Sequence, residues 1–201
     1  SSQIIKQLAP NQLVTIGGEG NTPFPWFTNN NSLSDYKFES LDYITIHIWI
    51  QNWEWYNPKK HSNTYNKALK KAKNYINEHL AIANTLNKPL VLEEFGISRD
   101  NLDYNKESTV NHRNQYFKDI FNILLENAET KTNFVGCNFW AWGGFGKVNT
   151  PGAVSNNHLE FIGDPAHEPQ GWYSIFETDS VTLQIIRDYN AKLDTLNNSY
   201  L

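Results

Sequence analysis

The hydrophobic residues of this chain gather in four short apolar runs, separated by longer polar or amphipathic stretches. The runs are QLVTIG at 12–17, DYITIHIWI at 42–50, PLVLEEF at 89–95 and FVGCNFWAW at 134–142. All four are rich in β-branched or aromatic residues, and none alternates cleanly between apolar and polar positions. This pattern predicts buried β-strands that are covered on both faces.

The stretches between and after these runs predict helices. Residues 63–87 and 111–128 carry apolar side chains at spacings of three and four, the pattern of an amphipathic helix. A last helix is predicted over 180–196, with Ser180 as its N-cap. The first residues, up to the run at 12–17, read as the tail of a helix leading into a strand. Strands that alternate with helices indicate βα units and a parallel sheet.

The number of βα units suggests only part of a larger architecture. Four units can be counted, whereas a closed barrel of this kind needs eight. An isolated four-stranded half would leave two unpaired sheet edges exposed. We therefore predict an α/β fold in which residues 1–201 supply about the last four units of a (β/α)8 TIM barrel. They would form the C-terminal part of a single domain, with no second domain.

Composition narrows the classes of function. The 201 residues carry a formal net charge of −4 and a pI near 5.8, whereas a nucleic-acid-binding protein normally shows a basic face. No run of eighteen apolar residues occurs, so no membrane-spanning helix is predicted. Cys137 is the single cysteine, which excludes a disulfide within the chain. Since the sequence contains no Met, we expect a processed, trimmed or partial chain.

Aromatic residues are frequent, at 14% of the chain against 19% for charged residues. Two interpretations fit equally well: a large aromatic core, or a groove in which aromatic rings stack on the apolar faces of sugars. The stretches that follow the predicted strands, at 18–32, 51–62 and 143–171, are crowded with Trp, Asn, Gly and Pro. A barrel of this type places its active site on these loops.

The third apolar run ends in two adjacent carboxylates, Glu93 and Glu94, followed by Phe95 and Gly96. A carboxylate at the C-terminal end of a barrel strand is well placed for catalysis, whereas an isolated glutamate more often belongs to an ion pair. Adjacent residues on a strand point to opposite faces, so we expect that the two acids do not serve the same site. The spacing alone does not choose between them.

The segment KPLVLEEFG at 88–96 resembles the seventh-strand motif of family 5 glycoside hydrolases, particularly their endo-β-1,4-mannanases. Further segments resemble other parts of these enzymes: APNQLVTIGGEG at 9–20 the fifth strand, DYITIHIWIQNW at 42–53 the sixth, and GCNFWAWGG at 136–144 the eighth. GDPAHEPQGWYSIFETDS at 163–180 resembles the loop after the eighth strand in bacterial mannanases. The motifs occur in the family's order, and the resemblance implies a retaining endo-β-1,4-mannanase.

The resemblance also implies roles for individual residues. Glu94, which immediately precedes the aromatic–glycine pair, would be the catalytic nucleophile. His47 and Trp49 would lie beside it and orient its carboxylate. Many relatives carry Tyr where this chain has Trp49, and that Tyr hydrogen-bonds the nucleophile directly. Trp140 would form the stacking floor under the sugar, and Glu19 would contact substrate on the leaving-group side.

Other aromatic and titratable residues carry weaker signals. Trp26 and Trp53 lie in loops after predicted strands, where they either line distal sugar subsites or pack the loops down. His112, His158 and His167 show no metal-ligand spacing, and we expect them to be surface or loop residues. Hydrolysis between two carboxyl groups needs no metal and no cofactor, so none is predicted.

A retaining glycosidase needs a second carboxyl group as acid/base, about 5–5.5 Å from the nucleophile. In the resembled family this group is the Glu of an Asn-Glu pair that ends the fourth strand. The pair Asn77-Glu78 falls inside a predicted helix, so we expect the acid/base to lie outside the 201 residues. The expected partners are β-mannan and the N-terminal half of the barrel, with no nucleic acid and no membrane.

Two alternatives remain open. A β-1,4-glucanase, or cellulase, can use the same scaffold, although the HIW and GDPAHEPQG segments favour mannan. A non-catalytic carbohydrate-binding half-barrel would use the Trp-lined face without an acid/base. Because a polysaccharide does not cross a membrane, an enzyme that acts on it is expected to be secreted or periplasmic.

Overall fold

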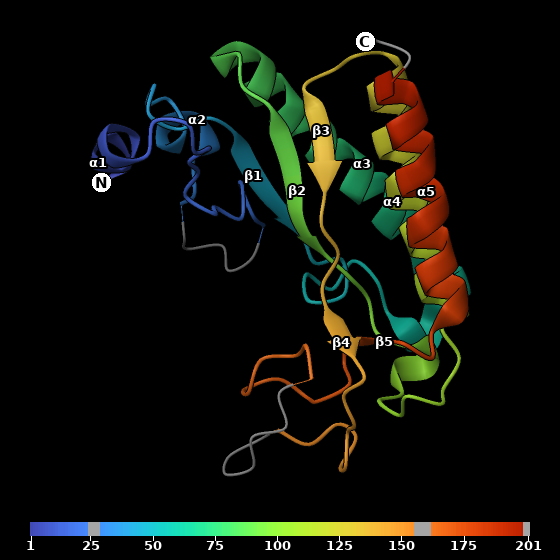
Figure 1. Ribbon diagram of the computed structural model, residues 1–201. Helices are drawn as coiled ribbons and strands as arrows, with labels where there is room; N and C mark the ends of the chain where they lie inside the picture. Colours follow the sequence, from blue (N-terminus) through green and yellow to red (C-terminus); the bar gives the residue numbers. More distant parts are fainter. Residues whose placement is uncertain (24–28, 155–161, 199–201) are drawn as a thin grey trace.

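The computed structural model describes residues 1–23, 29–154 and 162–198. Its centre is a parallel sheet with the strand order β1-β2-β3, formed by Ile44–Ile48, Leu90–Phe95 and Phe134–Cys137. A long helix follows each strand along the chain: α3 (His61–Leu86), α4 (Asn111–Glu129) and α5 (Ser180–Asn198). Figure 1 shows these three helices gathered on one side of the sheet. The predicted alternation of parallel strands and helices is confirmed.

Shorter elements surround this core. Two helices precede the sheet, α1 (Ser2–Leu8) and α2 (Ser32–Asp35). The 3-10 turns η1 (Pro58–Lys60) and η2 (Asp100–Leu102) lie in the loops after β1 and β2. Beyond β3, a small parallel pair joins β4 (Trp142–Gly144) to β5 (Ile175–Phe176). None of the helices in the described ranges is both long and apolar enough to cross a membrane.

Hydrophobic burial explains why these elements form. Ile44, Ile46 and Ile48 of β1 are fully buried, as the unbroken apolar run predicts for a covered strand. On α3 the buried residues recur at spacings of three and four, so that one helical stripe packs on the sheet. Burying a side chain of the size of isoleucine stabilises the fold by roughly 1.5–3 kcal/mol.

The first predicted strand, 12–17, is not observed as a strand, which corrects that prediction. The segment runs along β1, where the Asp42 N–H donates to the Val14 carbonyl (2.8 Å) and the His47 N–H donates to the Glu19 carbonyl (3.0 Å). The other bonds go to side chains: the Val14 N–H donates to the Asp42 carboxylate, and the Thr45 hydroxyl donates to the Gly18 carbonyl. These contacts attach the segment to β1 without a regular ladder.

The last predicted strand, 134–142, is divided into β3 and β4. The intervening residues still bond to β2, since the Asn138 N–H donates to the Leu92 carbonyl and the Trp140 N–H to the Phe95 carbonyl, both at 2.8 Å. The peptide bond between Trp140 and Ala141 is cis. The bond to Phe95, the last residue of β2, places Trp140 at the carboxyl end of that strand.

The predicted cap of the last helix also needs correction. The Leu183 N–H donates to the Asp179 carbonyl (3.0 Å), so Asp179 and not Ser180 holds the N-cap position of α5. Its side chain is committed to a buried ion pair, in which one Arg99 nitrogen donates to both carboxylate oxygens at 2.8 and 2.7 Å. The local sequence does not indicate that this helix cap also pairs with a buried arginine 80 residues away.

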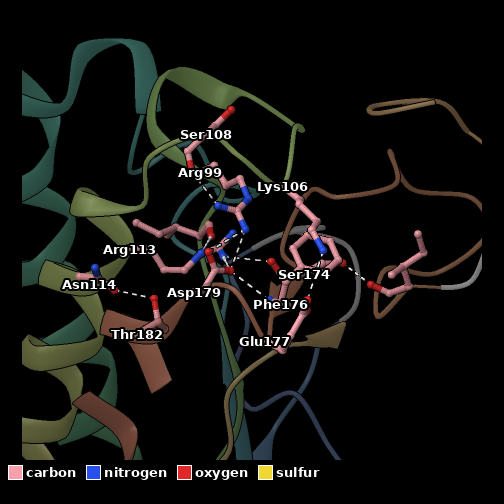
Figure 2. Close-up of polar contacts among 12 residues, drawn as sticks. Arg99, Lys106, Ser108, Arg113, Asn114, Ser174, Phe176, Glu177, Asp179 and Thr182 are labelled. Carbon is pink, nitrogen blue, oxygen red and sulfur yellow. Dashed lines mark hydrogen bonds and ion pairs between the residues drawn. The ribbon is translucent and has the colours of Figure 1, made fainter. Parts of the chain in front are cut away.

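Arg113 extends this ion pair into a buried polar network, drawn in Figure 2. Its guanidinium donates to the Ile97 and Ser174 carbonyls and lies 3.7 Å from the Asp179 carboxylate. Burial and the neighbouring Arg99 charge lower the pKa of Arg113 to about 10. The network joins the loop after β2, the start of α4, β5 and the start of α5, and so it fixes the loops at the carboxyl ends of the strands.

Candidate active site

The site begins at an irregularity in the pairing of β1 with β2. Ile46 pairs with Leu92, but the next residue, His47, pairs with Glu94, so Glu93 is an extra residue on β2. In such a bulge two residues oppose one, and the regular alternation of side chains is interrupted. Both glutamates therefore contact the same imidazole: Nε2 of His47 lies 3.3 Å from Glu93 Oε2, and Nδ1 lies 3.1 Å from Glu94 Oε2. The two acids therefore do not point to opposite faces, which corrects the expected geometry, but only Glu94 lines the pocket at this end of the sheet.

Glu94 lines a pocket of about 340 Å³ at the carboxyl end of the sheet. The other lining residues come from the segment along β1, the loop after β1, the end of the β3 region and the loop before β5. They are Glu19, Trp49, Asn52, Trp140, Pro165, His167, Glu168 and Tyr173. Loops that gather at the carboxyl ends of parallel strands are where α/β barrels bind their substrates.

Three aromatic rings form one wall of this pocket. The Trp49 ring lies 5.1 Å from the Tyr173 ring and 6.3 Å from the Trp140 ring, the latter in an edge-on arrangement at 79°. The Tyr173 hydroxyl donates a hydrogen bond to the Asn52 side-chain oxygen. Such rings give the pocket apolar faces, and its carboxylates and amide give it polar groups, the combination that suits a sugar.

Opposing influences act on the Glu94 carboxyl group. Burial raises its pKa most strongly, the positive charge of His47 lowers it, and the charges of Glu93 and Glu19 raise it again. Trp49, which lines the same pocket, favours the charged form of the carboxyl group and lowers the pKa. The net pKa of Glu94 is raised above its ordinary value.

The loop between β4 and β5 supplies a further acid, Glu168. Its pKa is raised, first by burial and then by the charge of Asp164. Asp164 holds this loop in shape, because its carboxylate accepts bonds from the Gly171 N–H (2.9 Å), the Tyr173 N–H (2.7 Å) and the Ser174 hydroxyl (2.5 Å). These bonds fix Tyr173 against Trp49.

The structure brings most of the predicted site residues together. Glu94, Trp49, Trp140 and Glu19 line one pocket, and His47 contacts Glu94 from the adjacent strand. Trp26 lies outside the described residues.

Trp53 is the exception among the predicted substrate contacts. It is 9% exposed and packs in the hydrophobic core, with its ring 4.9 Å from Trp55 and 5.2 Å from Tyr75. It is not among the residues that line the pocket with Glu94. Its ring is enclosed by other aromatic rings. The structure therefore supports the second interpretation, in which Trp53 packs its loop down, and not a contact with sugar.

Several pocket residues were not singled out from the sequence. Asn52, Glu168 and Tyr173 all lie within segments that carry the family resemblance, which was the signal that could have found them. His167 was expected to be a surface or loop residue; it is an exposed loop residue, but it also lines the pocket. Among the described residues, no cluster of three or more His, Cys, Asp or Glu is arranged to hold a metal ion.

A carboxylate at the end of a parallel strand, held by an imidazole and an indole within an aromatic pocket, is the kind of site that glycoside hydrolases use. Residues 1–198 match the family described as GH family 5 β-mannosidase-like. The chain therefore belongs to glycoside hydrolase family 5. The α/β fold matches solved enzymes of this family, which are TIM barrels.

Named relatives show the extent of the likeness. A family 5 mannosidase from Rhizomucor miehei superposes with a TM-score of 0.83 at 32% sequence identity, over 98% of this chain and 47% of that chain. An endo-β-1,4-mannanase from Thermotoga petrophila, at 21% identity, covers 96% of this chain and 38% of that chain with a TM-score of 0.58, and shows the fold alone.

Plant enzymes are similar at the level of sequence. Mannan endo-1,4-β-mannosidase 4 of Solanum lycopersicum is 27% identical over 144 residues, which are 68% of this chain and 34% of that protein. Mannan endo-1,4-β-mannosidase 5 of Arabidopsis thaliana is 24% identical over 150 residues, or 68% of this chain and 32% of that protein. The chain thus matches about a third of the plant relatives' length and about half of the Rhizomucor miehei enzyme's.

Proposed function

We propose that this chain carries the nucleophile of a retaining glycoside hydrolase that cleaves β-1,4-mannosidic bonds in mannan or galactomannan. The observation that carries the proposal is the setting of Glu94, whose carboxylate lines the pocket between His47 and the Trp49 indole. Glu94 attacks the anomeric carbon and forms a glycosyl-enzyme, which water then hydrolyses. Trp140 stacks under the sugar, and Glu19 contacts the leaving-group side.

The acid/base is proposed to lie outside the 201 residues, in the N-terminal half of the barrel. Asn77 and Glu78, the Asn-Glu pair of this chain, lie within α3, which supports that assignment. Glu168 and Glu19 line the same pocket as Glu94, so they provide the direct test. If Glu168→Gln or Glu19→Gln abolished the basic limb of the pH–rate profile, the acid/base would belong to this chain instead.

The central experiment is Glu94→Gln in the complete protein. Since glutamine cannot form the covalent intermediate, turnover of galactomannan is expected to fall by about 10⁴-fold or more. Mannan binding, measured by affinity electrophoresis, should remain largely intact because the amide keeps the size of the side chain. A Glu94→Gln enzyme with near-normal turnover would reject the assignment of the nucleophile.

Stereochemistry and substrate choice test the remaining parts of the proposal. Proton NMR of the first-formed product should show the β-anomer, since two displacements retain configuration. Galactomannan should be hydrolysed and carboxymethylcellulose should not. The relatives named above are mannan endo-1,4-β-mannosidases and a family 5 mannosidase, and these names do not favour the alternative of a β-1,4-glucanase.

A second candidate is an exo-acting β-mannosidase that releases single mannose units from short oligosaccharides. It is supported by the likeness to the Rhizomucor miehei mannosidase, a variant of which is described in complex with mannosyl-fructose. Early products from mannopentaose distinguish the two, because endo-action yields mixed oligosaccharides and exo-action yields mannose. Action on a polysaccharide supports the further proposal that the enzyme is secreted or periplasmic, which cell fractionation tests.

A further inference from the structure

Glu93 contacts the site without lining the substrate pocket. Its carboxylate reaches Nε2 of His47, the ring nitrogen opposite the one that faces Glu94. The side chain is 31% exposed, that of His47 is 10% exposed, and the imidazole lies between the two acids. The bulge in β2 creates this arrangement, because it sets both glutamates against one residue of β1.

The chemistry of these three groups restricts where the protons are. An ionised carboxylate only accepts hydrogen bonds, and a neutral imidazole has a single N–H. A neutral His47 would therefore turn a nitrogen lone pair toward one of the two carboxylates. Favourable contacts at both 3.3 Å and 3.1 Å require that both ring nitrogens carry protons when both acids are ionised.

We propose that Glu93 is a positioning residue for the nucleophile: it accepts the Nε2 proton of His47, fixes the ring, and so holds the charged imidazole with Nδ1 3.1 Å from the Glu94 carboxylate. The partner of one imidazole nitrogen determines the protonation and orientation of the other. The proposal rests on the proposed function, in which Glu94 is the nucleophile, and adds a residue that acts on it through His47.

Other titratable groups also surround Glu94, and the effect of losing Glu93 has to be distinguished from theirs. Glu19 faces Glu94 from the segment along β1, and Glu168 and His167 line the pocket from the loop before β5. These groups are the same in the wild type and in any Glu93 variant. The specific effect of Glu93→Gln is the loss of the negative charge that stabilises the second ring proton, because a neutral amide can still accept a hydrogen bond but does not stabilise an imidazolium as a carboxylate does.

Kinetics of the complete protein test this inference. Glu93→Gln is expected to lower kcat roughly 10²-fold through misplacement of the nucleophile, with KM for mannotriose little changed. The charge of His47 lowers the Glu94 pKa more than the charge of Glu93 raises it, so the acid limb of the kcat/KM profile should move to higher pH. Glu93→Asp, which keeps the carboxylate charge, should recover part of the rate. Glu107→Gln, on an exposed loop residue, is the matched control and should behave as wild type.

A spectroscopic readout is independent of turnover. Side-chain ¹⁵N shifts of His47 at neutral pH should show two protonated nitrogens in the wild type and one in Glu93→Gln. A singly protonated His47 in the wild type would overturn the inference, whatever the kinetics show. Thermal melts of each variant establish that it is folded. If Glu93→Gln does not fold, Glu93→Asp is still compared with the wild type.

The outcomes separate this inference from the proposed function. If Glu93→Gln kept the wild-type rate and pH profile while Glu94→Gln was inactive, the positioning role would fail and the proposed function would stand. If Glu93→Gln was inactive and Glu94→Gln active, the assignment of the nucleophile would fail as well. Loss of turnover in Glu94→Gln, together with a partial loss and a shifted acid limb in Glu93→Gln, is the result expected.

Discussion

Glu94 depends on a small number of neighbours for its protonation state, and the indole of Trp49 is one of them. Trp49→Phe removes the polar indole N–H that favours the charged form of Glu94 and keeps an aromatic ring against Tyr173. Trp49 lowers the Glu94 pKa, so the loss of its N–H raises the pKa, and the acid limb of the kcat/KM profile should move to higher pH. Because a hydrogen bond to a charged group contributes about 1.5–3 kcal/mol, kcat/KM should fall at least about tenfold.

The control for this prediction is Trp49→Tyr, whose hydroxyl retains a donor on an aromatic ring. Its acid limb should lie closer to that of the wild type than the Trp49→Phe limb does. The measurement is the kcat/KM profile on mannotriose across the acid range. Coinciding profiles of Trp49→Phe and the wild type would contradict the prediction.

At the residue scale, the site residues on strands were predictable from the sequence, and most of those on loops were not. His47, Trp49 and Glu94 lie on or just after strands whose apolar runs are recognisable, so motif position predicted them. Tyr173 and Glu168 lie in a loop that Asp164 holds in shape through its hydrogen bonds, and such a loop has no periodic pattern of apolar residues from which its side chains could be placed. Trp53 was misassigned for a related reason, since a loop tryptophan is equally able to fill a core.

At the scale of elements, the long helices and central strands were predictable because their periodicity is strong. The bulge between β1 and β2 was not, because the apolar pattern of β2 does not show which residue is left unpaired. The segment 12–17 has the composition of a strand, but its bonds go largely to side chains of the neighbouring chain segment. For both the bulge and the segment 12–17, the hydrogen bonds to the neighbouring segment determine the structure, and not β-propensity.

The close contact between the end of β2 and the segment after β3 leads to a prediction at this scale. A Cβ added to Gly96 would lie 2.5 Å from the Trp140 carbonyl oxygen, a backbone atom that cannot move aside without displacing the stacking residue. Gly96→Ala should therefore destabilise the fold by about 1–3 kcal/mol. Urea unfolding followed by tryptophan fluorescence measures the loss, and kcat should fall as well because Trp140 lines the pocket.

Gly136→Ala is the matched control for Gly96→Ala. It lies in β3, and an added Cβ there would meet no atom of the described chain within 4 Å. Its stability should stay close to that of the wild type. Equal losses in the two variants would mean that the contact with Trp140 is not the cause.

At the scale of the whole molecule, the sequence predicted an α/β fold with parallel βα units, and family membership is consistent with a barrel. Of the four predicted units, the described residues show three strands, each followed by a long helix, and an irregular segment along β1 where the fourth strand was predicted. The interactions that connect distant segments could not be predicted. Arg99 and Asp179 are 80 residues apart, and nothing near either residue in the sequence indicates its partner.

The buried network around Asp179 therefore carries the prediction for the molecule as a whole. Asp179 is the acid that pairs with both Arg99 and Arg113, and it also accepts the Phe176 N–H at 3.0 Å. Asp179→Asn would leave two buried guanidinium groups with too little compensating charge, so the free energy of unfolding should fall by roughly 3–5 kcal/mol. Urea unfolding of the complete protein measures this loss.

Asp194→Asn, at an exposed position near the other end of α5, is the control and should unfold as wild type does. If Asp179→Asn were equally stable, the network would not be what holds the loops at the carboxyl ends of the strands.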